Sequence, residues 1–210
     1  MGDAGRAGSE LNALKKSVMA ENVTSILMPG EYYSKVKDGA RFIVLNSDNS
    51  STVSEQFAWL NQEINRVSEK LIFLVYHHPT YSVSDSHSWT EKKDFQLQMR
   101  EFLKKNAPRI TALLLGHDHM SQFLMFGSVP VVIAGAGREV RNEGSVSFSE
   151  NSIKIETKYL APRQPHWGLL EIASGAAEAT ITFIRVSGQK RSCTARFRNS
   201  EMLLEGECRQ

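Results

Sequence analysis

The sequence has few cysteines, no long apolar run and almost no net charge. Its only two cysteines are Cys193 and Cys208, which excludes a disulfide-rich scaffold and leaves room for one optional bridge near the C-terminus. No stretch approaches the roughly 18 apolar residues of a membrane-spanning helix, so we expect no membrane partner. A net charge of +2 and the lack of a basic stripe with interleaved aromatic residues argue against a nucleic-acid partner.

The start of the chain also lacks an apolar stretch of the kind found in signal peptides. We therefore expect a soluble protein whose compartment is undecided, with the cytoplasm as the default. A length of 210 residues is enough for one domain with a substantial core and short for two. A single domain across residues 1–210 is the simplest expectation.

Helices and strands alternate through the first half of the chain. Apolar residues at helical spacing predict helices, and continuous apolar runs predict buried strands. The expected elements are a helix at 11–21, strands at 23–28 and 41–45 with a turn at Asp38-Gly39 before the second, a helix at 54–68, a strand at 71–75, a helix opened by a capping box at Ser88–Glu91, and a strand at 110–115. This alternation predicts an α/β layered fold.

Only strand candidates follow residue 120. They lie at 123–126, 129–133, 153–159, 169–172, 179–186 and 193–197. We expect this half to be antiparallel and to complete a sheet rather than to form a second domain. Residues 137–151 are polar and rich in turn-forming residues, which is typical of a mobile loop.

Four of the six histidines lie in two pairs, and each pair follows an apolar strand. The pairs are His77 with His78, and His117 with His119. Loops at the carboxyl ends of strands in an α/β sheet converge on one crevice, and imidazole is a common ligand of zinc, iron and manganese-type centres. A lone histidine is more often a surface or core residue, so that interpretation stays open beside a shared metal site.

These two motifs resemble a known family. Leu74–Ser82 and Gly116–His119 are similar to the last two motifs of calcineurin-like metallophosphoesterases, and most of all to the purple, tartrate-resistant acid phosphatases. Tyr32–Ser34, Phe42–Leu45 and Ala134–Gly137 resemble segments at matching places in that branch. The resemblance covers most of the chain from 32 to about 190. It implies an α/β fold of central mixed β-sheets flanked by helices, incomplete on its N-terminal side.

The family's earlier motifs are poorly matched. Asp3-Ala4-Gly5 resembles the first, Asp-x-Gly, without the strand that should precede it. The second and third motifs, Gly-Asp-x-x-Tyr and Gly-Asn-His, do not occur, so we expect a missing segment near residues 30–32. That segment would have carried the bridging aspartate, the asparagine ligand and a histidine that assists catalysis. Glu31 as a substitute bridge, with Tyr33 as a ligand, is the less favoured alternative.

The resemblance implies two metal ions, iron together with zinc, manganese or iron. Asp3 and His119 would bind the first ion, and His77 and His117 the second. His78 is the candidate catalytic residue; a role next to the ligands, toward substrate or in packing alone stays open. We assign no particular residue to substrate binding. Without the bridging carboxylate the remaining ligands are too few for a tight pair of ions, so we expect one weakly held ion or none.

The function implied by the resemblance is hydrolysis of a phosphoester by a metal-activated water. A small phosphomonoester is the expected substrate, and the lost motifs predict an activity that is weakened or absent. The alternative is a catalytically silent relative that serves as a binding or structural module. The oligomeric state does not follow from the sequence.

Overall fold

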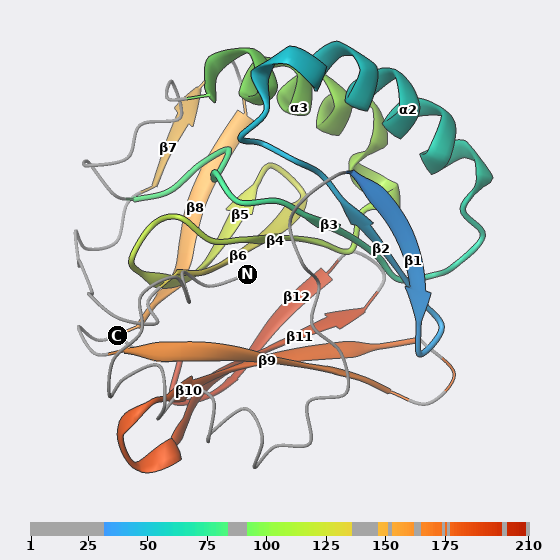
Figure 1. The fold of residues 1–210 in the computed structure, drawn as a ribbon. Coiled ribbons are helices and arrows are strands. Elements are labelled where there is room, and N and C mark those ends of the chain that lie inside the picture. Colours follow the sequence, from blue (N-terminus) through green and yellow to red (C-terminus); the bar gives the residue numbers. More distant parts are fainter. Residues whose placement is uncertain are drawn as a thin grey trace.

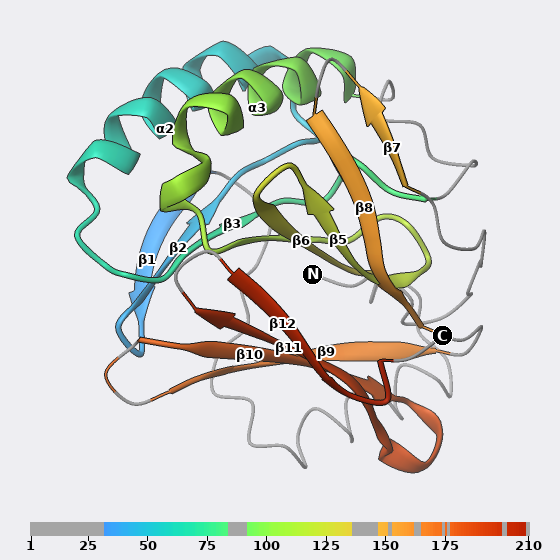
Figure 2. The same cartoon turned by 180° about the vertical axis from the view of Figure 1, so that it is seen from behind.

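The computed structural model describes residues 32–83, 92–135, 147–150, 153–161, 165–173, 175, 177–198 and 201–208. This part of the chain forms three layers (Figure 1). Helices α2 (Val53–Arg66) and α3 (Lys93–Asn106) cover one face of an eight-stranded sheet. A four-stranded sheet covers the other face, as the view from behind shows (Figure 2). The expected α/β layered fold is confirmed.

Several expectations concern residues outside these ranges. They are Asp3, the helix at 11–21, the strand at 23–28, the gap near 30–32, the capping box at Ser88–Glu91 and most of the loop at 137–151. All of them stay predictions. Within the described residues, the helices expected at 54–68 and after residue 91 are confirmed as α2 and α3. None of the described helices is long and apolar enough to cross a membrane.

The larger sheet has the strand order β1-β2-β3-β4-β6-β5-β8-β7. Its strands are β1 (Tyr33–Lys37), β2 (Ala40–Val44), β3 (Ile72–Val75), β4 (Ala112–Leu115), β5 (Ser121–Phe126), β6 (Val129–Ala134), β7 (Ser147–Glu150) and β8 (Ile153–Leu160). Strands β2, β3, β4 and β6 run parallel to one another, and the other pairings are antiparallel. The carboxyl ends of the four parallel strands therefore share one edge of the sheet.

The smaller sheet is antiparallel throughout, in the order β12-β11-β10-β9. Its strands are β9 (His166–Ile172), β10 (Ala179–Arg185), β11 (Arg191–Arg198) and β12 (Glu201–Gly206). The second half of the chain thus divides between two sheets: β5 to β8 complete the larger one, and β9 to β12 form another. The expectation of antiparallel strands that complete a sheet is confirmed for the pairings within β5 to β8. It is corrected for β9 to β12, which form a separate sheet, and for β6, which also pairs in parallel with β4 of the first half.

A disulfide joins Cys193 in β11 to Cys208, with the Cα atoms 4.5 Å apart. The optional bridge is therefore present. Disulfides are rare in the cytoplasm and persist in oxidising compartments. The bridge therefore needs oxidising surroundings to form, and the compartment of the chain stays a prediction.

Alternation along β3 explains why a continuous apolar run forms a strand. Ile72 and Leu74 belong to the apolar cluster beneath the helices, whereas Phe73 and Val75 belong to the cluster between the two sheets. Successive side chains of a strand point to opposite faces, and both faces of this strand are covered. A strand buried on both faces needs apolar residues at every position, and these four are at most 4% exposed.

The hairpin of β1 and β2 was predicted only in part. Its two-residue turn has positive φ angles at Asp38 (52°) and Gly39 (77°), which is the type I′ geometry that Asp-Gly favours. The sequence identified this turn and β2, but not β1, whose polar sequence is half exposed. Strands β7 and β12 were also not predicted, since short or charged edge strands carry little apolar signal. Three short 3₁₀ helices lie at Ser50–Thr52, Ala107–Arg109 and Ser187–Gln189.

Candidate metal centre

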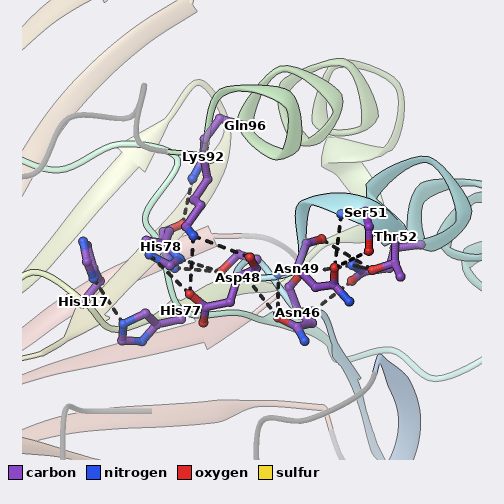
Figure 3. A network of polar contacts seen from close by, with 12 residues as sticks. Asn46, Asp48, Asn49, Ser51, Thr52, His77, His78, Lys92, Gln96 and His117 are labelled. Carbon is purple, nitrogen blue, oxygen red and sulfur yellow. Dashed lines mark hydrogen bonds and ion pairs between the residues drawn. The ribbon is translucent and has the colours of Figure 1, made fainter.

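Three histidine side chains meet beyond the carboxyl ends of β3 and β4 (Figure 3). His77 and His78 follow β3 after Tyr76, and His117 follows β4 after Gly116. One ligand atom from each ring lies within 4.8 Å of those of the other two. The ring centroids are 4.3–4.9 Å apart. Parallel pairing of the two strands is what brings residues 40 positions apart into contact.

His77 and His117 make the closest of these contacts. Nδ1 of His117 lies 3.1 Å from Nε2 of His77, and the amide of Gly116 donates to the carbonyl of His77 at 3.1 Å. Two nitrogen ligands at about 2.0–2.1 Å from a common ion are separated by about 2.9–3.4 Å, depending on whether the geometry is octahedral or tetrahedral. The observed separation is that of a hydrogen bond between the two rings, and it also fits two ligands of one metal ion.

The backbone at His117 adopts an uncommon conformation. Its φ is +65°, in the left-handed region that costs a residue with a Cβ roughly 1 kcal/mol or more. Two tight turns follow, in which Asp118 donates to the carbonyl of Gly116 at 2.8 Å and Met120 to that of Asp118 at 2.7 Å. Such strain persists only where the surroundings enforce it, and it occurs often at functional sites.

Gly135, at the end of β6, is what holds this loop in place. A Cβ on Gly135 would lie 1.7 Å from the backbone oxygen of Asp118, so only glycine allows the two segments to pack. The amide of Gly135 also donates to the carbonyl of Met120 at 3.0 Å. Asp118 is fully buried beneath this contact. The family-like segment Ala134–Gly137 thus has a physical role, which is to support the loop that carries His117.

His78 is buried and hydrogen-bonded through both its ring and its backbone. Its side chain is 7% exposed, and Nδ1 lies 2.9 Å from the hydroxyl of Ser47, which also accepts the His78 amide at 3.1 Å. The side-chain amide of Gln96 donates to the carbonyl of His78 at 2.9 Å. Burial, followed by repulsion from His117, lowers the pKa of His78 to about 4, against an opposing attraction from Asp48. The ring is therefore neutral at physiological pH.

A polar loop after β2 completes the site. Asn46 arranges it by accepting the backbone amides of Asp48 and Asn49 at 2.9 and 3.2 Å. Asp48 then presents a carboxylate oxygen 3.8 Å from Nε2 of His78 and 3.6 Å from the ammonium of Lys92 (Figure 3).

The sequence prediction missed these supporting residues. Ser47 and Asp48 directly follow a predicted strand, and the ends of parallel strands lie together. That placement was the available signal for them. No sequence signal would have selected Gln96 and Lys92, which come from the region of α3.

The remaining predicted ligands have different outcomes. His119 is half-buried and is not a member of the three-histidine group. Asp3 lies outside the described residues. Among the residues that the structure describes, the three histidines are the one group with ligand atoms clustered for a metal ion. The assignment of Asp3 and His119 to the first ion of a pair stays a prediction.

Sequence comparison finds relatives among acid phosphatases. The chain is 25% identical over 143 residues to the tartrate-resistant acid phosphatase type 5 of Rattus norvegicus and 28% identical over 142 residues to that of Homo sapiens. Each match covers 64% of this chain but only 39% and 40% of the relative. The chain thus spans about two fifths of the length of the curated relatives it matches. No family model matches the sequence.

Two solved structures share the fold. The first is described as GAP50, the anchor in the inner membrane complex of Plasmodium, with a TM-score of 0.61 and 12% identity over 88% of this chain and 61% of that chain. The second is PhoD, with a TM-score of 0.53 and 11% identity over 95% of this chain and 50% of that chain. The sequence matches and the shared fold confirm the resemblance of this chain to the calcineurin-like metallophosphoesterases, in the branch of the purple acid phosphatases.

Proposed function

We propose that this chain is a metal-dependent phosphoester hydrolase of the acid phosphatase type, with an activity well below that of its full-length relatives. The observation that carries the proposal is the 3.1 Å separation of Nδ1 of His117 and Nε2 of His77 at the shared carboxyl edge of the parallel strands. These two nitrogens would hold one divalent or trivalent ion, of zinc, manganese or iron. Small phosphomonoesters are the proposed substrates.

The donor set supports one ion rather than two. A bound ion polarises a phosphoryl oxygen and lowers the pKa of a coordinated water. Two dications at close range repel strongly, and carboxylates shared between them are what offset the repulsion. The described cluster contains three imidazoles and no carboxylate. We therefore propose one ion for this chain, and a second only if Asp3 and His119 supply the remaining ligands.

The same donor set supports a second candidate function. A metal site without its bridging carboxylate loses much of its catalytic power while the fold survives, which would leave a catalytically silent binding or structural module. Buried apolar residues from both sheets form one cluster, which joins the sheets into what we propose is one domain. A single domain is compatible with either function. Activity and metal content measured together separate the two candidates.

The test is metal content and phosphatase activity on the full chain after reconstitution with zinc, manganese or iron. We expect about one ion per chain and slow hydrolysis of p-nitrophenyl phosphate, both lost in His117→Ala. Lys104→Ala, an exposed change on α3, is the matched control and should alter neither. Metal retention without hydrolysis would favour the silent module. Two ions with rapid turnover would overturn the one-ion proposal, and unchanged metal content in His117→Ala would overturn the site.

A further inference from the structure

We infer that His78 is a third metal ligand, so that His77, His78 and His117 form a mononuclear three-histidine site. This inference rests on the proposed metal binding at His77 and His117, and it makes His78 a ligand of the ion instead of a residue beside the ligands. It departs from a two-ion site in which only two of these histidines take part. The argument depends on where the His78 ring is held, which of its nitrogens is available, and what lies beside that nitrogen.

The position of the His78 ring matches that of a ligand. Its centroid lies 4.3 Å from that of His117 and 4.9 Å from that of His77, and one of its nitrogens lies within 4.8 Å of ligand atoms on both. Three imidazoles facing one point leave a fourth position open, which is the arrangement of catalytic zinc sites. Nitrogens bound to one ion at about 2 Å lie about 2.9–3.4 Å apart. The ring of His78 therefore has to turn so that its ligand nitrogen moves up to about 1.5 Å nearer to the other two.

Contact with Ser47 occupies Nδ1 of His78 and leaves Nε2 as the nitrogen that can bind an ion. The Ser47 hydroxyl lies 2.9 Å from Nδ1 and accepts the backbone amide of the same histidine. Metal-bound histidines almost always donate their other ring N–H to a fixed partner. With Nδ1–H donated to Ser47, the lone pair is on Nε2. Gln96 restrains the same residue through its carbonyl, so Ser47 is a positioning residue for His78.

Asp48 adds negative charge at the open side of the group. Its carboxylate lies 3.8 Å from Nε2 of His78, the nitrogen that Ser47 leaves available. The side chain of Asp48 is 65% exposed, and Lys92 lies 3.6 Å from the same oxygen. A carboxylate beside a group of imidazoles stabilises a bound dication. The nitrogen-rich set favours zinc, cobalt or copper over magnesium and calcium.

Cobalt(II) is the probe that counts these ligands. The full chain is titrated with Co²⁺ while the visible absorption is recorded, and X-ray absorption of the cobalt or zinc form counts the imidazoles. We expect one intensely absorbing ion of low coordination number with three imidazoles. His78→Ala should weaken affinity at least 100-fold and change the spectrum, and Ser47→Ala should weaken it about 10- to 100-fold. Lys104→Ala is again the control.

The outcomes separate this inference from the proposed function. If His117→Ala abolishes binding while His78→Ala leaves affinity and spectrum unchanged, the two-histidine site stands and the third ligand is rejected. If neither substitution affects binding, the third ligand and the proposed metal site at His77 and His117 are both rejected. Should His78→Ala fail to fold, the count of imidazoles in the unmodified chain decides alone, because two imidazoles per ion would overturn the inference.

Discussion

The carboxyl edge of the larger sheet and the smaller sheet are built in opposite ways. At the edge, His117 has a positive φ, and Gly135 has no room for a side chain against Asp118. The smaller sheet is a regular antiparallel ladder with one irregularity, in β10, and a disulfide across its end. The edge has uncommon backbone geometry where the rings converge, whereas the smaller sheet has ordinary geometry and a dense apolar face.

This difference indicates a division of labour. The apolar side chains of β10 and β11 pack against the larger sheet and stabilise the fold; Phe183, Cys193, Ala195 and Phe197 are all completely buried. At the carboxyl edge, part of that stability offsets the cost of the strained backbone that holds the three imidazoles together. Substitutions in the smaller sheet should therefore change stability without changing metal affinity in the folded chain, and substitutions at the edge should change both.

Phe183→Ala should have the largest effect on stability. Phe183 is fully buried and stacks on Phe123 of the larger sheet with ring centroids 4.3 Å apart. Removal of a buried phenyl ring costs about 3–5 kcal/mol, measured as a loss in the free energy of unfolding in urea. Cobalt affinity of the remaining folded protein should equal that of the unmodified chain. A large loss of affinity would show that the two regions are coupled.

Gly135→Ala should cost about 3 kcal/mol, at the upper end for overpacked positions, because its Cβ would overlap the backbone oxygen of Asp118. Unlike Phe183→Ala, it should also weaken metal binding, since the displaced loop carries His117. The matched control is Gly168→Ala, where the nearest atom to an added Cβ is an ordinary 3.5 Å away. Equal effects of the two substitutions, in urea unfolding and cobalt titration, would contradict the role of the close contact.

Loss of the disulfide should lower the free energy of unfolding by about 2–3 kcal/mol. The bridge closes a loop of 15 residues. Closing a loop of this length lowers the conformational entropy of the unfolded chain, which stabilises the folded state by about 2–3 kcal/mol. Thermal unfolding of Cys193→Ala/Cys208→Ala, and of the unmodified chain with and without reductant, measures the change. The metal content should be the same in all samples. A change in metal content on reduction would mean that the smaller sheet supports the site directly.

The smallest expected effect isolates the strain at His117. Both His117→Gly and His117→Ala remove the imidazole, but only glycine adopts a φ of +65° without steric cost. His117→Gly should therefore be more stable than His117→Ala by about 1 kcal/mol. Neither variant should bind cobalt. Equal stability in urea unfolding would show that the loop relaxes when the ring is removed.

The elements that sequence reasoning identified share a local signal. Helix α2 shows apolar residues at helical spacing, β3 and β4 are continuous apolar runs, and Asp38-Gly39 is a strong turn signal. Local signals also placed both histidine pairs directly after strands. The partners of strands β9 to β12 were not predicted. They depend on which faces of the sheets pack together, and this information is spread over the whole chain.

By itself the sequence determined the metallophosphoesterase resemblance, the layered fold class and the positions of His77, His78 and His117 at strand ends. Only the tertiary structure decided that His78 contacts Ser47, 31 residues away, and that Gly135 lies against Asp118. The physical reason is the parallel alignment of β2, β3, β4 and β6. It brings four loops with no sequence relation to one another to the same edge, where contact distances, and not residue types, determine which side chains can share an ion.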